Sequence, residues 1–146
     1  MKGLVVIPFH NEGQVAELYS EELILTFQSS NHINVDFYLA NDFSSDDTKN
    51  YLDSIKNKYN NVVIQNNKEN LGHGKTVVNG YLYAIENNYQ YVVQIDGDNA
   101  AEPKSIMQLV KNPLIRISTF HCKKNKPPRQ ANPKNNYFYF KNKFKF

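Results

Sequence analysis

The sequence predicts an α/β fold in which helices cover a parallel sheet. Short apolar or β-branched runs alternate four times with segments whose apolar residues follow helical spacing. The connections between them are short, which favours right-handed crossovers between parallel strands. A chain of 146 residues, 40% of them hydrophobic, is long enough for one domain with a buried core. We therefore expect one sheet, with its ligand site outside the carboxyl ends of the strands.

The first half of the alternation predicts two strands and two helices. Strands are expected at residues 4–7 and 35–40, where β-branched or apolar runs end in polar residues. A helix is expected over residues 14–27, with the apolar face Val15, Leu18, Tyr19, Leu23 and Phe27. The next helix is expected to start at Ser44-Ser45-Asp46-Asp47, with a hydroxyl N-cap and acidic residues in its first turn. Its apolar face is Tyr51, Leu52, Ile55 and Tyr59.

The second half repeats the pattern. A third strand is expected at residues 61–65, followed by a polar loop from Asn66 to Gly74. The helix after this loop has the apolar residues Val78, Tyr81, Leu82 and Ile85. A fourth strand is expected at residues 91–95. Pro103, which suits the first helical position, then opens a helix with the apolar residues Ile106, Leu109 and Val110.

The charge of the chain changes abruptly after Lys111. Residues 1–111 hold 8 basic and all 14 acidic residues, a net charge of −6, whereas residues 112–146 hold 9 basic residues and no acidic one. The second segment also lacks a periodic apolar pattern, so it cannot bury enough surface to offset its ordering entropy. We expect residues 1–111 to form the folded region and residues 112–146 to be an irregular, basic low-complexity tail that is disordered or loosely packed.

The composition excludes several classes of protein. Cys122 is the single cysteine, which excludes an intramolecular disulfide or a thiolate zinc site and fits a reducing compartment. All apolar runs are far shorter than the roughly 18 to 20 residues that span a bilayer, so no transmembrane helix is predicted. The apolar run after Met1 stops at Pro8, too early for a signal peptide. No histidine metal site is predicted, because the histidines have no ligand spacing; they are His10, His32, His73 and His121.

The turn Asp96-Gly97-Asp98 is a candidate metal site. Two carboxylates at alternate positions of an extended segment share a face, and glycine lets the backbone bend toward a ligand. Paired hard oxygens are ligands that Mg²⁺ or Mn²⁺ accepts while it keeps room for phosphate oxygens. A solvated Asp-Gly turn is the competing interpretation, and the motif alone does not decide between the two.

The segment Gly72-His73-Gly74-Lys75-Thr76 is a candidate anion site. It is neither a Walker A loop nor a dinucleotide fingerprint, because Glu69 and Val77 stand where those motifs need glycine. The backbone amides of the loop, Lys75 and the N-terminus of the following helix remain suited to an anion. A plain glycine-containing connector is equally consistent with this segment.

Polar residues also follow the first two strands. Asp42 is suited to accept hydrogen bonds from a base or a ribose, whereas we interpret Asp46 and Asp47 as serving the start of the next helix. Asn11 and Glu12 have two interpretations, ligand contacts or capping of the first helix, and capping is the stronger one for Asn11. All four predicted strands thus end in segments with candidate functional residues.

Four segments stand in order along the chain, each at the end of a predicted strand. They are Val6-Ile7-Pro8-Phe9-His10-Asn11-Glu12, Asn41-Asp42-Phe43-Ser44-Ser45-Asp46-Asp47-Thr48, Asn70-Leu71-Gly72-His73-Gly74-Lys75 and Asp96-Gly97-Asp98. Together they resemble the family 2 glycosyltransferases of the GT-A fold. The resemblance covers residues 3–110 and implies the Rossmann-like, nucleotide-binding half of a GT-A domain, here truncated.

The resemblance implies a hexosyltransferase-type, inverting enzyme that takes a nucleotide-sugar donor. The residues that match donor-binding positions are Pro8, Phe9, Asn11, Glu12, Asp42, Gly72, Lys75 and Asp96. By this resemblance Asp42 faces the base, and the loop from Gly72 to Lys75 lies near the base and diphosphate. Asp96 and Asp98 match the family's DxD motif. They imply Mg²⁺ or Mn²⁺ as a cofactor, which neutralises charge on the departing nucleoside diphosphate.

The resemblance does not extend to the catalytic base. In the family this base is a carboxylate from the second half of the domain, and residues 112–146 contain no carboxylate side chain. We therefore assign no base and interpret the tail as the result of a frameshift or truncation. The acceptor, a polyprenyl phosphate or a saccharide, stays open. The resemblance also implies a cytoplasmic location, at the inner face of the membrane in the full-length family context.

Two other functions compete with an active transferase. One is a non-catalytic remnant or nucleotide-binding module, whose exposed sheet edge invites a partner chain or aggregation. The other is single-stranded nucleic-acid binding through Tyr137-Phe138-Tyr139-Phe140 and the neighbouring lysines. We do not favour nucleic-acid binding, because low-complexity sequence produces the same pattern by chance.

Overall fold

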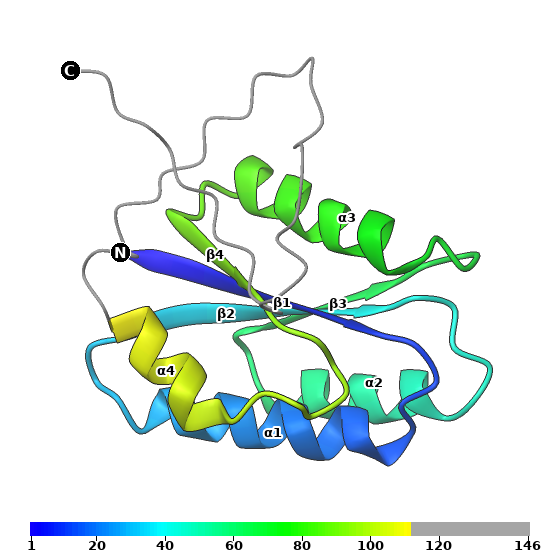
Figure 1. Ribbon diagram of the computed structural model, residues 1–146, viewed down its shortest axis with the longest axis horizontal. Coiled ribbons are helices and arrows are strands. Elements are labelled where there is room, and N and C mark those ends of the chain that lie inside the picture. Colours follow the sequence, from blue (N-terminus) through cyan, green and yellow to red (C-terminus); the bar gives the residue numbers. More distant parts are fainter. Residues whose placement is uncertain (112–146) are drawn as a thin grey trace.

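The computed structural model describes residues 1–111, which form one sheet flanked by helices (Figure 1). The strands are β1 Lys2–Phe9, β2 Asn34–Asn41, β3 Val62–Asn66 and β4 Tyr91–Gln94. The helices are α1 Gln14–Gln28, α2 Thr48–Lys58, α3 His73–Glu86 and α4 Pro103–Lys111. The predicted basic, disordered tail and its truncation or frameshift concern residues 112–146, which lie outside the described residues.

All neighbouring strands are parallel, in the order β3-β2-β1-β4. Helices α1, α2 and α4 cover one face of the sheet and α3 covers the other (Figure 1). The predicted α/β class and parallel sheet are therefore confirmed. The predicted strands agree with the observed ones to within two residues, because a sheet covered on both faces needs the continuous apolar runs that the sequence shows.

The central strand β1 joins the two parts of the core. Every residue from Gly3 to Phe9 is buried. Val5 and Ile7 belong to the cluster packed under α1, α2 and α4, whereas Leu4 and Val6 belong to the cluster packed under α3. The carboxyl end of β1 is therefore held from both faces, which gives the loops that follow the strands a rigid support.

The predicted apolar face of α1 is partly wrong. Tyr19, Leu23 and Phe27 are buried as predicted, but Val15 and Leu18 are 40% and 57% exposed. The buried face is completed instead by other residues of the helix, which are Ala16, Ser20 and Ile24. The helix therefore packs on a face that includes small residues, and these were not counted by the apolar spacing.

The predicted apolar face of α3 is wrong for a similar reason. Of the predicted residues, Val78, Leu82 and Ile85 are exposed and Tyr81 is half-buried. The buried residues are Thr76, Val77, Gly80 and Ala84. A Cβ atom added at Gly80 would lie 2.5 Å from Cγ1 of Val6, so the helix approaches β1 through its small residues. The small residues Gly80 and Ala84 on this face permit the close approach to the sheet.

Helix α2 starts later than predicted. The predicted N-cap pair Ser44-Ser45 lies in the preceding loop, and the helix begins at Thr48. Asp46 serves the helix start as predicted, since its Oδ1 accepts the N–H of Thr48 at 3.0 Å. Asp47 stands at the N-cap position but makes no capping hydrogen bond with its side chain. The hydroxyl of Thr48 instead accepts the N–H groups of Glu12 and Gly13, at 3.0 and 2.8 Å, which satisfies donors at the start of α1.

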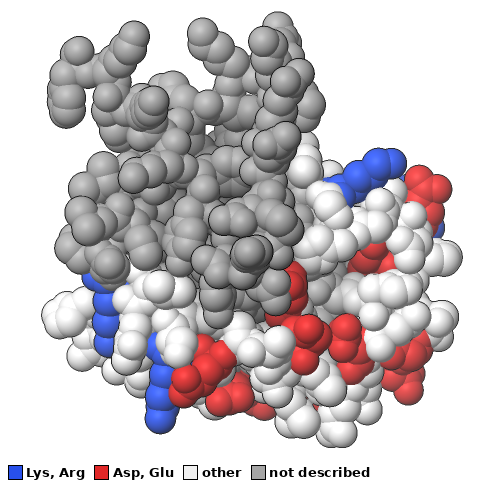
Figure 2. Space-filling view, in the orientation of Figure 1, with Lys and Arg blue, Asp and Glu red and all other residues white. Residues whose placement is uncertain are grey.

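The surface of residues 1–111 reflects their net negative charge. In the view of Figure 2, acidic side chains gather on the lower and right parts of the described surface, and few basic ones accompany them. Within these residues, no helix has the length and apolar character needed to cross a membrane.

Ser20 on α1 is expected to reduce stability. It is fully buried, and its hydroxyl has no hydrogen-bond partner within residues 1–111. Ser20→Ala should raise the free energy of unfolding by about 1 kcal/mol, because it removes an unsatisfied hydroxyl and favours the helix. Urea denaturation measures this change. Ser54→Ala on α2 is the matched control: the Ser54 hydroxyl donates to Glu17 at 2.8 Å, so this variant should not gain stability, and an equal gain in both variants would contradict the interpretation.

Candidate functional site

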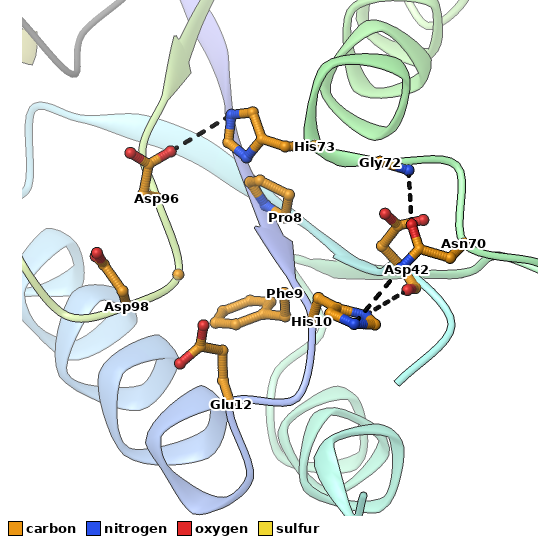
Figure 3. A pocket seen from close by; sticks show the side chains of 11 residues that line it. Pro8, Phe9, His10, Glu12, Asp42, Asn70, Gly72, His73, Asp96 and Asp98 are labelled. Atoms are coloured by element: carbon orange, nitrogen blue, oxygen red, sulfur yellow. Dashed lines mark hydrogen bonds and ion pairs between the residues drawn. The ribbon is translucent and has the colours of Figure 1, made fainter. Parts of the chain in front are cut away.

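A cavity of about 410 Å³ lies at the carboxyl ends of β1, β2 and β4, beside the N-terminus of α3 (Figure 3). It is lined by Pro8, Phe9, His10, Glu12, Asp42, Asn70, Gly72, His73, Asp96, Gly97 and Asp98. Because β1 stands between β2 and β4, the segments that follow these three strands meet at one edge of the sheet. The cavity therefore lies where the sequence predicts the ligand site.

Most of the predicted site residues line this cavity: Pro8, Phe9, Glu12, Asp42, Gly72, Asp96 and Asp98. Asn11 and Lys75 do not. Asn11 also does not cap α1, because Gly13 stands at the N-cap position. Its Oδ1 accepts the N–H of Ser45 at 2.8 Å, so Asn11 ties the segment after β1 to the segment after β2. Lys75 is exposed in the first turn of α3.

Three further lining residues, His10, Asn70 and His73, stand in the predicted strand-end segments but were not among the individually assigned donor-binding residues. His10 Nδ1 lies 2.8 Å from the carbonyl oxygen of Asp42. A carbonyl oxygen only accepts, so Nδ1 carries the proton and donates. Nε2 then accepts from the side-chain amides of Asn11 and Asn70, at 3.2 and 3.5 Å. The sequence did contain a signal for these three residues, which is their place in the predicted strand-end segments. The spacing between histidines does not identify His10 and His73 as site residues.

Asp42 is the most buried carboxylate of the cavity and is 3% exposed. Its Oδ1 accepts the side-chain amide of Asn67 and the N–H of Leu71, both at 2.8 Å. Burial alone would raise the pKa of Asp42, but hydrogen bonds from Asn67, Leu71, Thr76 and Gly72 outweigh burial and lower this pKa below its ordinary value. The ionised carboxylate thus holds the loop between β3 and α3, which forms one wall of the cavity.

The turn after β4 forms the opposite wall (Figure 3). The Asp96 side chain is 32% exposed, and Asp98 is exposed, with its Oδ1 accepting the N–H of Ala100 at 3.0 Å. Gly97 between them packs against β1, where an added Cβ atom would lie 2.6 Å from the carbonyl oxygen of Pro8. The absence of a side chain at Gly97 therefore brings both carboxylates close to the end of β1.

The donor set of this turn suits a cation that shares its ligands with another molecule. Within residues 1–111, no group of three or more His, Cys, Asp or Glu side chains is arranged to hold a metal ion. Asp96 and Asp98 each use Oδ1 in a protein hydrogen bond, which leaves Oδ2 of each for a ligand. Two hard oxygens fit Mg²⁺ or Mn²⁺ when phosphate oxygens and water supply the remaining ligands.

Carboxylates lie on both sides of the cavity but are not evenly spread. Those of Glu12, Asp96 and Asp98 lie toward one side in Figure 3, whereas the N-terminus of α3 lies on the other, beside Asp42, whose charge is already engaged by hydrogen bonds from the protein. The first turn of α3 contains no acidic residue, and its unpaired N–H groups and helix dipole favour an anion. The cavity thus has one wall with three carboxylates and another that carries a helix N-terminus, whose N–H groups suit an anion.

The sequence matches a known family over most of the described chain. Residues 4–113 match the family model described as glycosyl transferase family 2. Among curated proteins, the uncharacterized protein MJ0544 of Methanocaldococcus jannaschii is 27% identical over 110 residues, which cover 74% of this chain and 45% of that protein. The chain therefore spans less than half the length of this relative.

Solved structures with a similar fold include TarS from S. aureus and a mannosyltransferase. Residues 1–349 of TarS from S. aureus are 21% identical, with a TM-score of 0.56 over 75% of this chain and 31% of that chain. The mannosyltransferase PcManGT from Pyrobaculum calidifontis, in complex with GDP-Man and Mn²⁺, is 16% identical and has a TM-score of 0.59. The match covers 77% of this chain and 33% of that chain. TarS is also known in complex with UDP-GlcNAc. At these identities the likeness shows the fold, and the chain spans about a third of those structures.

Proposed function

Because this chain belongs to glycosyl transferase family 2, we propose that its cavity binds a nucleotide-sugar donor together with a divalent cation, for glycosyl transfer. The observation that carries this proposal is the meeting of Asp42, the α3 N-terminus and the Asp96-Gly97-Asp98 turn around one cavity. Its volume of about 410 Å³ falls in the range of small-molecule sites. Residues 1–111 are then the donor-binding region.

The donor is proposed to lie across the two walls of the cavity. Its nucleoside lies against Pro8 to Glu12 and against Asp42, with Asp42 toward the base. Its diphosphate lies near the loop from Gly72 to Lys75, toward the N-terminus of α3, where the N–H groups of the first turn and the charge of Lys75 favour an anion. The N–H of Gly72 is not among these donors, because it already donates to Oδ1 of Asn70 at 2.9 Å. Lys75 is exposed and does not line the cavity, so we propose that it contacts the outer phosphate. Two structurally similar proteins are known with such donors, UDP-GlcNAc and GDP-Man.

The cation is proposed to be Mg²⁺ or Mn²⁺, held by Asp96 and Asp98. Asp96 also faces the ribose. When bound, such an ion neutralises negative charge that develops on the departing nucleoside diphosphate. The protein's part is to present two carboxylate oxygens on a turn packed tightly against β1. Without a cation, the carboxylates of this wall would repel the diphosphate.

The chemistry beyond donor binding rests on the family alone. We propose an inverting, hexosyltransferase-type reaction, with a polyprenyl phosphate or a saccharide as the acceptor and a location in the cytoplasm. No residue within 1–111 is assigned as the catalytic base. The test for transfer is release of nucleoside diphosphate from a donor, and retention of all donor in the presence of both acceptor classes would support a nucleotide-binding module instead.

Donor binding can be tested by calorimetry on the full chain. We expect saturable heat with UDP or GDP, and with UDP-GlcNAc or GDP-Man, only when Mn²⁺ or Mg²⁺ is present. Asp98→Ala should weaken this binding by about 10-fold or more, because it removes a charged ligand of the cation. Asp53→Ala is the matched control, since Asp53 lies on α2 in an exposed ion pair with Lys49. The absence of cation-dependent heat with all four compounds would exclude the proposal.

A further inference from the structure

Gln94 is a polar residue in a buried apolar strand. It is the last residue of β4 and is 1% exposed, between Val93 and Ile95, which are also buried. A parallel strand covered on both faces normally consists of apolar residues. A buried amide costs free energy unless its polar atoms are hydrogen-bonded. The presence of glutamine here therefore calls for an explanation.

The amide of Gln94 contacts the carboxylate of Asp96. Gln94 and Asp96 are alternate residues of an extended segment, so their side chains share the face of the sheet covered by α3. Nε2 of Gln94 donates to Oδ1 of Asp96 at 2.8 Å. The same oxygen lies 3.6 Å from Nε2 of His73 on α3 (Figure 3). Oδ1 of Asp96 is thus engaged by the protein, whereas no hydrogen bond or ion pair within residues 1–111 engages Oδ2.

The other end of the amide is not satisfied. Oε1 of Gln94 is buried and has no hydrogen-bond partner within residues 1–111. Leaving a buried acceptor unpaired is unfavourable, and an apolar side chain of similar size would not carry this cost. The stability of the fold therefore does not account for Gln94. Its hydrogen bond to Asp96 is the contribution that an apolar residue would lack.

We propose that Gln94 is a positioning residue, which holds the Asp96 carboxylate so that Oδ2 is presented to the cavity. This inference rests on the function proposed above. Carboxylates that bind metal ions or polar ligands are commonly oriented by a hydrogen bond from a neighbouring group, and loss of that group weakens binding by about 10- to 100-fold. Gln94 does this from inside the sheet, where its own rotamer is restricted by packing.

The test separates positioning from structure, because the two roles predict different changes in stability. Gln94→Met and Gln94→Leu replace the glutamine by an apolar side chain of similar size, which removes both polar atoms of the amide, Nε2 and Oε1. For the full chain, we expect each variant to bind UDP or GDP with Mn²⁺ about 10-fold more weakly than wild type. Their melting temperatures should be unchanged or higher, because the unpaired Oε1 is gone. Gln90→Met is the control, since Gln90 is exposed and its Oε1 accepts the N–H of Lys2 at the opposite edge of the sheet.

A double variant adds a second readout. In the Asp96→Asn background, Gln94→Met should cause little further loss of nucleotide affinity, because the group that it positions has already been changed. Wild-type affinity in the Gln94 variants would overturn the inference and leave the proposed donor site intact. A melting temperature that falls together with affinity would show a structural role and would also overturn it. If wild type binds neither nucleotide with Mn²⁺, the proposed function fails and this inference fails with it.

Discussion

Gly80→Ala is expected to lower the free energy of unfolding by about 1–2 kcal/mol. An added Cβ atom would lie 2.5 and 2.9 Å from the two Cγ atoms of Val6 and 3.3 Å from Cδ1 of Tyr38. Val6 and Tyr38 are both buried, and the β-branched side chain of Val6 has little rotamer freedom. Overpacking of this kind costs about 1–3 kcal/mol, and the gain in helix propensity offsets only roughly 1 kcal/mol of that cost.

The consequence should extend to the cavity. If α3 moves away from β1, its N-terminus moves with it, and this end carries Gly72 and His73 of the cavity wall. We therefore expect weaker nucleotide binding as well as a lower melting temperature. Gly74→Ala is the matched control for stability in the same helix, because a Cβ atom there has no neighbour within 4 Å. Equal melting temperatures for the Gly80 and Gly74 variants would contradict the close packing of α3 on β1.

Asp42→Asn is expected to lower the free energy of unfolding at pH 7 by about 2 kcal/mol. The ionised carboxylate of Asp42 accepts hydrogen bonds from Asn67 and Leu71, and hydrogen bonds to charged groups contribute about 1.5–3 kcal/mol. The asparagine side chain keeps one oxygen acceptor, but it has no charge, and an NH₂ donor replaces the second carboxylate oxygen. The loop between β3 and α3 should therefore be held less firmly, which hydrogen exchange at Leu71 would detect.

The stability that Asp42 contributes should depend on pH in a defined direction. The pKa of Asp42 is lowered in the folded protein from its ordinary value of 3.8, so its contribution is fully present above that value. It is lost as the pH falls through the lower pKa of the folded state. The difference between wild type and Asp42→Asn in urea denaturation should therefore shrink in strong acid. Asp53→Asn, at an exposed ion pair, should change the stability by less than about 0.5 kcal/mol at pH 7. A difference for Asp42→Asn that does not depend on pH would exclude this role of the carboxylate.

The edge of the sheet that carries the cavity was predictable because its signals are local. Runs of apolar residues mark the strands, and Pro8, Asp42 and Asp96 each stand where such a run ends. Parallel strands joined by helices necessarily bring these ends to one edge. Residues far apart in the sequence could therefore be assigned to one site before their distances were known.

The α/β class, the order of the elements and the edge at which polar residues gather follow from the amino-acid sequence alone. The buried face of α3, the partners of His10 and the contact of Gln94 with Asp96 follow from the packing of the elements against one another. These features depend on distances and shapes between elements, whereas spacing along the chain records only the types of side chain. A helix that packs through Gly80 places its small residues inward, and no count of large apolar residues predicts that choice.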